Sequence, residues 1–422
     1  MKKGEAPFNQ NNRPHWVEPG RGKELPVTQS APFSRPMQTE IQSDLVGLFR
    51  GAVQIALEAC LNEAVRDLVG AGKYERLWSR KDTLNGTYLR RVLTSMGHIE
   101  AQMPRTRENG SPTEVLGRYS RRTGEIDRMI TEAYVQGSST RDVSRLTRAL
   151  MGQGVSRSTV SRITKSLEER IEALRNEPIS QEMPYLFLDA TYVDARWARS
   201  VENISALVAY GVGLDGHRHL LAVTIGSEES DESWGDLLSQ LLDRGLTGVR
   251  LVIRDDHRGL AKAVRRLLPE AKQQRCTVHL TRNVMVKAPH RLRARVGRAV
   301  TAVFHADSPT QAKQRLAAFR AGLGAHVPEA LACLEAGFEA ATQFFAFPKI
   351  HWSRIHSTNG VERLHGEIKR RTRAVGAFPD RQSALRLITA VALEATAIWS
   401  DRRYLDMTVL KASPKKEVAA AA

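Results

Sequence analysis

Acidic residues stand where two apolar runs end, and their positions suit metal chemistry. The run 185–188 precedes Asp189, and the run 251–253 precedes Arg254, Asp255 and Asp256. Carboxylates that end neighbouring strands can converge on a hard cation such as Mg²⁺, which takes oxygen ligands. Two such cations about 4 Å apart activate an attacking oxygen and stabilise a leaving one at phosphorus. These positions predict a divalent-metal site for phosphodiester chemistry.

Only one of the two adjacent aspartates can face that site, because successive strand residues point to opposite faces. Asp256 precedes a helix expected to begin near Arg258, where a short acid caps free backbone N–H groups. We therefore assign Asp255 to the metal and Asp256 to the helix cap, with His257 beside it in a structural role. Asp194 falls on the strand face opposite Asp189 and is expected to be an exposed polar residue.

A third carboxylate is expected from a helix near the end of the chain. Glu362, in the segment STNGVERLH, is the best candidate. Arg363 follows it directly and supports the site. A basic run follows in the same helix and is suited to holding phosphates; its members are Lys369, Arg370, Arg371 and Arg373.

The charge balance points to a polyanionic partner. The 422 residues include 63 Lys and Arg against 46 Asp and Glu, a net charge of +17, and such a field most often serves nucleic acid. The alternative explanations of the positive charge are an arginine-rich proteome and binding to an anionic membrane. The sequence contains no run of 18 uncharged apolar residues, so no membrane span is expected. No secretory signal is evident. Three cysteines far apart in the sequence favour a reducing, cytoplasmic compartment.

The ends of the chain and its N-terminal third have distinct compositions. Residues 1–38 are rich in Pro, Gly, Asn and Gln and are expected to be disordered. Residues 39–125 are predicted to form a helical and small β region for dimerisation and DNA binding, with one or two amphipathic helices over 41–69 and short strands around Gly97. Residues 405–422 are expected to be a flexible tail.

Residues 126–178 have the pattern of a helix-turn-helix. Ser139 and Asp142 have the spacing of a capping box, and Ser156 can cap a second helix after the break at 153–154. A polar cluster at the start of that second helix is placed to read the major groove; it comprises Arg157, Ser158, Thr159 and Arg162. The alternative is an ordinary helical hairpin with a solvated basic face.

After residue 184 the hydrophobic period changes to that of strands. Three strands, helix, strand, helix, strand is the order of an RNase H-like α/β core, predicted over 179–285, with the last strand in AKQQRCTVHL. An all-helical insertion over 286–350 and closing helices over 351–404 follow. Arginines of the insertion form either a solvated helix face or a DNA-backbone track; they are Arg291, Arg293, Arg295 and Arg298.

Three stretches together resemble bacterial insertion-sequence transposases of the Mutator type: RDDHRGLAKAV…QQRCTVHLTRNV, HWSRIHSTNGVERLHGEIKRRTRAVGAFPD and the upstream PRTRENGSPTEVLGRYSRR. The likeness spans about residues 75–404. It implies a DDE enzyme with an RNase H-like core interrupted by a helical insertion, and it matches the three acids to Asp189, Asp255 and Glu362. The family usually has Ser-Asp-Gly where this chain has residues 254–256. Two Mg²⁺ per site are implied, with Mn²⁺ as a substitute.

The resemblance also assigns a C-x-x-H element to Cys276 and His279. Zinc is disfavoured because a structural site needs four ligands, so we expect Cys276 in the core and His279 at the scissile phosphate or packed beside the acids. A Trp-x4-Tyr ending matches Trp399 and Tyr404, which are expected to be core anchors.

The function implied by this resemblance is DNA transposition. Such an enzyme binds terminal inverted repeats, hydrolyses a phosphodiester at the element end and joins the exposed 3′-OH to target DNA. Its partners are double-stranded DNA, at both element end and target, and further copies of itself in a dimer or larger synaptic complex. Its place is the bacterial cytoplasm, at the nucleoid. The alternatives are a catalytically inactive DNA-binding protein and an RNase H-like nuclease without strand transfer.

Overall fold

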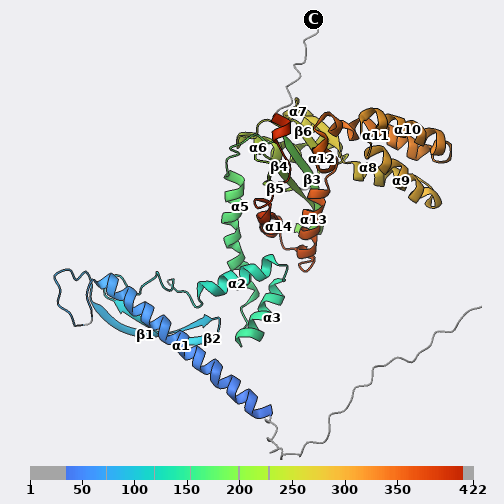
Figure 1. Ribbon diagram of the computed structural model, residues 1–422. Coiled ribbons are helices and arrows are strands. Elements are labelled where there is room, and N and C mark those ends of the chain that lie inside the picture. The colour runs from blue at the N-terminus through green and yellow to red at the C-terminus, as the bar shows by residue number, and fades with distance from the viewer. Residues whose placement is uncertain are drawn as a thin grey trace, which may run out of the picture.

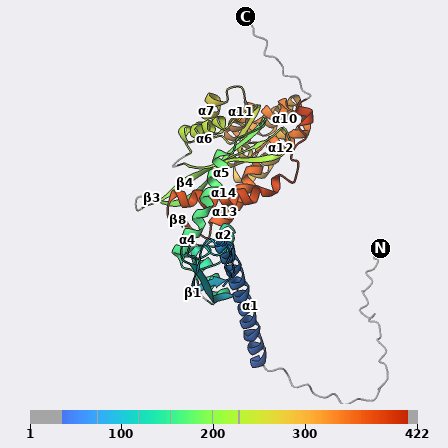
Figure 2. The ribbon, with the colours of Figure 1, turned by 90° about the vertical axis from the view of Figure 1, so that its left-hand side faces the viewer.

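The computed structural model describes residues 35–411 except 73, 118, 153, 198–199 and 227–228, with side chains from residue 45 to 410 apart from that of Trp197. The disorder expected for 1–34 lies outside these residues. A helix and a hairpin form one end of an elongated molecule, a helical unit lies in the middle, and a mixed sheet with its helices forms the other end (Figures 1 and 2).

The N-terminal end consists of the long helix α1 (Arg35–Val69) packed on a hairpin of β1 (Leu84–Thr94) and β2 (Gly97–Thr106). Gly97 adopts φ +98°, as the tight turn between the strands requires. Residues 35–38 belong to α1, which corrects the expectation that they are disordered. The segment Leu45–Val69 is long and apolar enough to cross a membrane by length and composition, although charged residues interrupt it.

The middle unit is a set of short helices. α2 (Gly124–Val135), α3 (Thr140–Met151) and α4 (Arg157–Ile163) share a core that includes Ile126, Val143 and Val160. A 3₁₀ turn η1 (Thr164–Ser166) and α5 (Leu167–Asn176) follow, and α5 buries Leu167 and Ile171 in the core of the sheet domain. The capping box is confirmed: the Asp142 N–H donates to Ser139 Oγ, and the Ser139 N–H donates to the Asp142 carboxylate. Ser156 likewise accepts from the Thr159 N–H. The α3–turn–α4 pair is therefore fixed at both helix starts.

A mixed sheet carries the C-terminal half. Its strands are β3 (Tyr185–Trp197), β4 (Ser200–Val212), β5 (Arg218–Gly226), β6 (Leu251–Arg254) and β7 (Lys272–Arg275), in the order β5-β4-β3-β6-β7. β3, β4 and β5 are antiparallel neighbours, whereas β6 runs parallel to β3 and β7 parallel to β6. A short strand β8 (Ala377–Phe378), which the sequence pattern did not predict, pairs with the far end of β3.

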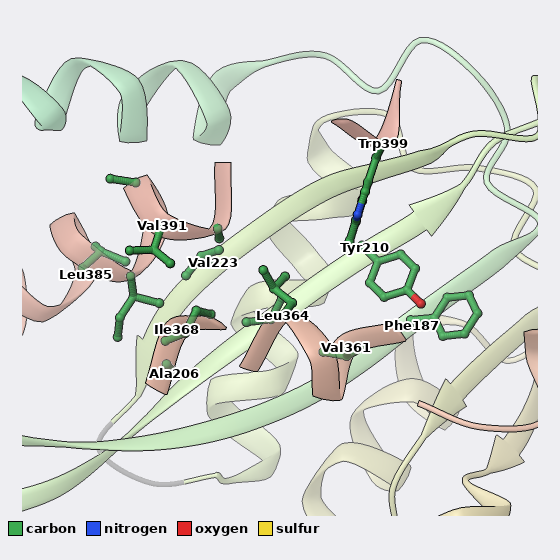
Figure 3. Close-up of a cluster of buried hydrophobic side chains, with 14 of the residues drawn as sticks. Phe187, Ala206, Tyr210, Val223, Val361, Leu364, Ile368, Leu385, Val391 and Trp399 are labelled. Carbon is green, nitrogen blue, oxygen red and sulfur yellow. The ribbon is translucent and has the colours of Figure 1, made fainter. Parts of the chain in front are cut away.

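Helices cover both faces of the sheet. On one face, α6 (Asp231–Asp243) and α7 (Arg258–Leu267) enclose an apolar layer that includes Leu186, Leu188 and Trp234. On the other face, α13 (Asn359–Thr372) and α14 (Arg381–Thr396) pack with α5 against the cluster shown in Figure 3. The sequence therefore builds a three-layer α/β domain.

The end of the chain completes that second layer. Trp399 is buried and Tyr404 largely so, as expected of core anchors, and the Arg218 guanidinium lies 4.1 Å from the Trp399 ring centroid and 4.7 Å from that of Tyr404. Residues 405–411 do not form the expected tail, because Leu405, Met407 and Leu410 are buried in the same cluster and α15 (Thr408–Lys411) follows. Residues 412–422 lie outside the described part.

The predicted helical insertion is present and has its own core. It contains α8 (Thr277–Val286), η2 (His290–Leu292), α9 (Arg293–Phe304), α10 (Pro309–Leu323), η3 (Gly324–His326) and α11 (Pro328–Ala341). The turns η4 (Gln343–Ala346) and η5 (Lys349–His351) and the short α12 (Trp352–Ile355) return the chain to α13, and η6 (Ala397–Trp399) ends α14. The strand predicted in AKQQRCTVHL ends at Arg275, so Cys276 and His279 stand at the start of α8 instead.

The insertion leaves and rejoins the sheet at one point. The buried Gln274 amide at the end of β7 donates to the Ala341 carbonyl (2.8 Å) and accepts from the Phe344 N–H (2.9 Å). Beside it, the Thr277 N–H donates to the His356 carbonyl (3.1 Å). These bonds join the first and last residues of the insertion.

Candidate active site

Asp189 and Asp255 occupy matching positions on neighbouring parallel strands. β3 pairs with β6 through Tyr185–Leu251 and Phe187–Ile253, and both acids stand two residues further along. The Asp189 side chain is 6% exposed and accepts from the Ala190 N–H (3.1 Å). Burial, and then the charge of Asp255, raise the pKa of Asp189 well above its usual range. Asp189 therefore lies inside β3, which continues to Trp197, and not at a strand end as expected, whereas Asp255 directly follows the last residue of β6. The two carboxylates are close enough for their charges to interact.

This pair suits a divalent cation. Hard oxygen ligands and an uncompensated negative charge are what Mg²⁺ requires, and a bound cation would relieve the repulsion between Asp189 and Asp255. Among the described residues, no group of three His, Cys, Asp or Glu side chains is gathered closely enough to hold a metal ion. The residues that fit a divalent cation here are therefore the two aspartates, Asp189 and Asp255.

Asp256 is not the helix cap. His257 is the N-cap of α7, and its ring nitrogen accepts from the Leu260 N–H at the long distance of 3.5 Å. The Asp256 carboxylate instead pairs with Arg275 on β7 (2.7 Å), and its side chain is 56% exposed. Asp255 accepts from the His257 N–H (3.2 Å) and faces Asp189. The preference for Asp255 is therefore consistent with the geometry, but the reason given for it was wrong.

Glu362 lies in the first turn of α13 and is held by two cationic groups. Its carboxylate accepts from Arg282 of α8 (3.1 Å) and lies 3.3 Å from His279 Nε2. The same helix places His365 Nδ1 3.6 Å from the Asp189 carboxylate. Burial lowers the pKa of His365 to about 3, so this imidazole is neutral near neutral pH. α13 thus places His365 against Asp189, and Glu362 against Arg282 and His279.

Cys276 and His279 form a polar pair beside the acids. The Cys276 thiol is buried, and both the N–H and the hydroxyl of Thr358 donate to its sulfur (3.3 Å each). Interaction with Cys276, and then the charges of Asp189 and Glu362, raise the pKa of His279 to about 9 despite partial burial. Of the two positions expected for His279, the structure places it beside the acids, and its imidazole is cationic at neutral pH.

Glu229 is a buried carboxylate that the sequence reasoning missed. It accepts from Tyr192 Oη (2.9 Å) and from Trp234 Nε1 (3.2 Å), and lies 3.8 Å from His257 Nδ1. Burial, and then the charge of Asp255, raise its pKa. Its Ser- and Glu-rich sequence neighbourhood gave no signal, because Trp234 is only five residues away but Tyr192, on β3, reaches it only through the fold. Asp194, by contrast, is exposed as expected and accepts from Asn203 (2.9 Å).

The basic residues proposed for DNA contact divide into exposed and structural ones. Arg371 is buried, pairs with Glu394 (2.8 Å) and donates to the Val135 carbonyl (3.4 Å), so its assignment to DNA binding is wrong. Arg370 is exposed but pairs with Glu367 (2.8 Å). The exposed candidates are Arg157, Ser158, Arg162, Arg291, Arg293, Arg295, Arg298, Arg363, Lys369 and Arg373, whereas Thr159 is half-buried.

Comparisons with known proteins agree on one family. The chain matches the family described as "Transposase, Mutator family" over residues 27–401. The transposase for insertion sequence element ISRM5 of Rhizobium meliloti is 36% identical over 89% of this chain and 94% of its own length. Those for IS406 of Burkholderia multivorans and for IS256 in transposon Tn4001 of Staphylococcus aureus are each 35% identical, over 82% and 81% of this chain and 90% and 88% of their own lengths.

Among solved structures, the Drosophila P element transposase strand transfer complex aligns with 67% of this chain and 83% of its own, at 12% identity and a TM-score of 0.30, a likeness too low to bear on the fold. The matched family and the insertion-sequence relatives define the class of protein: an enzyme that cleaves or transfers nucleic acid. The chain belongs to the Mutator family of transposases.

Proposed function

We propose that this chain is a DDE-type insertion-sequence transposase with an RNase H-like core. It binds the terminal inverted repeats of its element, hydrolyses a phosphodiester at each end and transfers the exposed 3′-OH to target DNA. One observation carries the proposal. Asp189 and Asp255 each stand two residues beyond the Phe187–Ile253 pair of β3 and β6, and their charges interact, in a chain of this family. The strand order β5-β4-β3-β6-β7, three antiparallel strands followed by two parallel ones, supports the RNase H-like assignment.

Asp189 and Asp255 would hold the divalent cations, with Glu362 as the third ligand. Two Mg²⁺, or Mn²⁺ in their place, supply activation of the attacking oxygen and stabilisation of the leaving oxygen. The carboxylate of Glu362, which is paired with Arg282 and His279, would be the third ligand to the cations. The cationic His279 and the exposed Arg282 are then placed to bind a phosphate beside the acids, an arrangement that orients the scissile bond.

DNA contact is assigned to the exposed basic residues on three elements. The start of α4 offers Arg157 and Ser158 to base edges, as in helix-turn-helix proteins. The arginines of η2 and α9, Lys369 of α13 and Arg373 directly after α13 are exposed and would neutralise DNA phosphates. A dimer or larger complex follows from the need to cut two element ends together.

A cleavage and strand-transfer assay with labelled element-end DNA and Mg²⁺ tests the proposal. Wild type should cut at the repeat boundary and join the product, whereas Asp255→Asn should do neither. Asp256→Asn is the matched control, because its carboxylate is exposed and paired with Arg275, and it should keep most activity. End-specific binding without cleavage in Mg²⁺ or Mn²⁺ would identify an inactive DNA-binding protein. Cleavage without joining would identify a nuclease.

A further inference from the structure

Helix α1 carries apolar residues on two opposite faces. One face packs on the hairpin through Val53, Leu57 and Leu61, and further along through Val65 and Val69. The other face is exposed, and we call it the outer stripe. Its members are Leu45, Leu48, Phe49, Ala52, Ile55, Ala56 and Ala59. Because all of these residues are exposed, the outer stripe lacks a covering partner within the chain's described residues.

The outer stripe has the spacing of a coiled-coil seam. Leu45, Leu48, Ala52, Ile55 and Ala59 follow one another at intervals of three and four residues, which is the a/d pattern of two heptads. The side chains of Leu48 and Ile55, both seam positions, are the most exposed of the set, at 71% each. A seam of this kind is matched by a second helix with the same repeat, and α1 of another copy provides one.

A membrane is a poorer occupant of this face. A bilayer around Leu45–Val69 would also have to bury the hairpin packed on its other side, whose outward residues include the exposed Arg91 and Glu100. Glu58 is fixed to that hairpin by accepting from the Gln102 N–H (2.9 Å). Buried charges of this kind are strongly disfavoured in lipid. Nucleic acid is disfavoured as well, because no residue of the outer stripe is basic.

The exposed area is what a dimer of this size needs. The large apolar side chains of the outer stripe, Leu45, Leu48, Phe49 and Ile55, are 47–71% exposed, which leaves on the order of 500 Å² open. Two copies would together bury on the order of 1,000 Å², the lower limit for a specific interface. Both views of the ribbon show α1 extending away from the sheet and its helices, so a second copy reaches it without covering the acids (Figures 1 and 2).

We propose that two copies of this chain associate through the outer stripe of α1, in a two-stranded coiled coil that holds two DNA-binding subunits together. The association itself depends only on α1. Its role in joining two element ends rests on the proposed transposase function.

Light scattering on the full-length chain without DNA, over a concentration series, tests the association. Wild type should have twice the 47.0 kDa mass of one chain. Leu48→Glu combined with Ile55→Glu should raise the dissociation constant at least about tenfold, because each places a charge in the seam. Ile398→Glu, at a residue 66% exposed on η6, is the matched control and should stay dimeric. Ala52→Leu, which enlarges a seam residue, should tighten the dimer, a gain that misfolding cannot produce.

Two results would overturn the proposal: a wild type that stays monomeric throughout the series, or a dimer that the double variant leaves intact. If the wild-type chain sediments with phosphatidylglycerol vesicles and the double variant does not, the outer stripe binds a membrane instead. Paired-end and single-end DNA substrates separate this proposal from the proposed function. The double variant should still cut single-end DNA but should no longer cut the two ends of a paired-end substrate together. A wild type that cuts neither substrate would refute the proposed transposase function without affecting the result on the dimer.

Discussion

Replacing Asp189 by Asn should stabilise the metal-free protein while abolishing catalysis. Asp189 is 6% exposed, and its neighbour His365 is neutral because burial lowers the pKa of that imidazole to about 3. Burial and the charge of Asp255 raise the pKa of Asp189, so its ionised form opposes folding. An unsatisfied buried polar group costs about 1–3 kcal/mol, and a charged one more. Asn keeps the shape, removes the charge and should recover an energy of that order.

The sign of the pH dependence follows from the same pKa. A carboxyl whose pKa is raised on folding contributes stability in its protonated form, and that contribution is lost as pH rises through the folded-state pKa. The advantage of Asp189→Asn should therefore be largest at neutral and higher pH and should shrink as the solution is acidified. With saturating Mg²⁺ the order should reverse, because a cation that binds only the folded wild type stabilises it by about 4.1 kcal/mol at 1,000 times its dissociation constant.

Thermal and urea unfolding in EDTA and in Mg²⁺ measure these differences. A gain of 1–3 kcal/mol corresponds to several degrees in Tm for a domain of this size. Asp194→Asn is the control: it lies on the same strand, is exposed and accepts from Asn203, and should change neither curve. An Asp189→Asn protein that is less stable than wild type in EDTA would refute the electrostatic reasoning, and an unchanged response to Mg²⁺ would refute the metal assignment.

Three further substitutions test individual contacts. Arg371→Ala should lower the free energy of unfolding by about 3 kcal/mol in urea titrations, because it leaves the partly buried Glu394 without its ion-pair partner. Normal stability with weakened DNA binding would instead show that Arg371 contacts DNA. Ser139→Ala removes the cap of α3 and should cost about 1 kcal/mol in the same titration, and no loss would mean that the box is unimportant. Gly360→Ala places a Cβ 2.4 Å from the buried Tyr210 hydroxyl and must displace the first turn of α13. End cleavage should then fall on the order of a hundredfold, whereas wild-type rates would show that the turn tolerates the shift.

The acids and the strands that carry them could be predicted because both leave local signals. An apolar run that meets an acid locates the strand beside that acid, but it does not fix where the strand ends: β6 ends before Asp255, whereas β3 continues past Asp189 to Trp197. The choice between residues 255 and 256 was less secure. Three consecutive polar residues follow β6, and the backbone path decides which of them caps α7. His257 does so, a residue type outside the usual capping set.

Other features had no local signal or had one that was overlooked. Arg371 follows Leu364 and Ile368 at helical spacing, so its position on the buried face of α13 was readable despite the basic run around it. Glu229 accepts from Tyr192 of β3, 37 residues away in the sequence, and this donor approaches it only once the sheet has formed. The pairing of Glu362 with Arg282 joins α13 to α8 across the insertion and cannot be read from either segment alone.

The bonds of Gln274 and Thr277 to residues 341, 344 and 356 close the insertion into a loop whose two ends coincide. Lengthening such a loop costs little in closure entropy, and its far end does not set where α13 begins. The number of residues between the second and third acids is therefore free to drift among relatives without moving the third acid. Chain spacing alone is for this reason a poor guide to that acid, and the segment that rejoins β7 is the better one. The same junction offers a place where foreign helices could be exchanged for the native ones while the two aspartates stay in register.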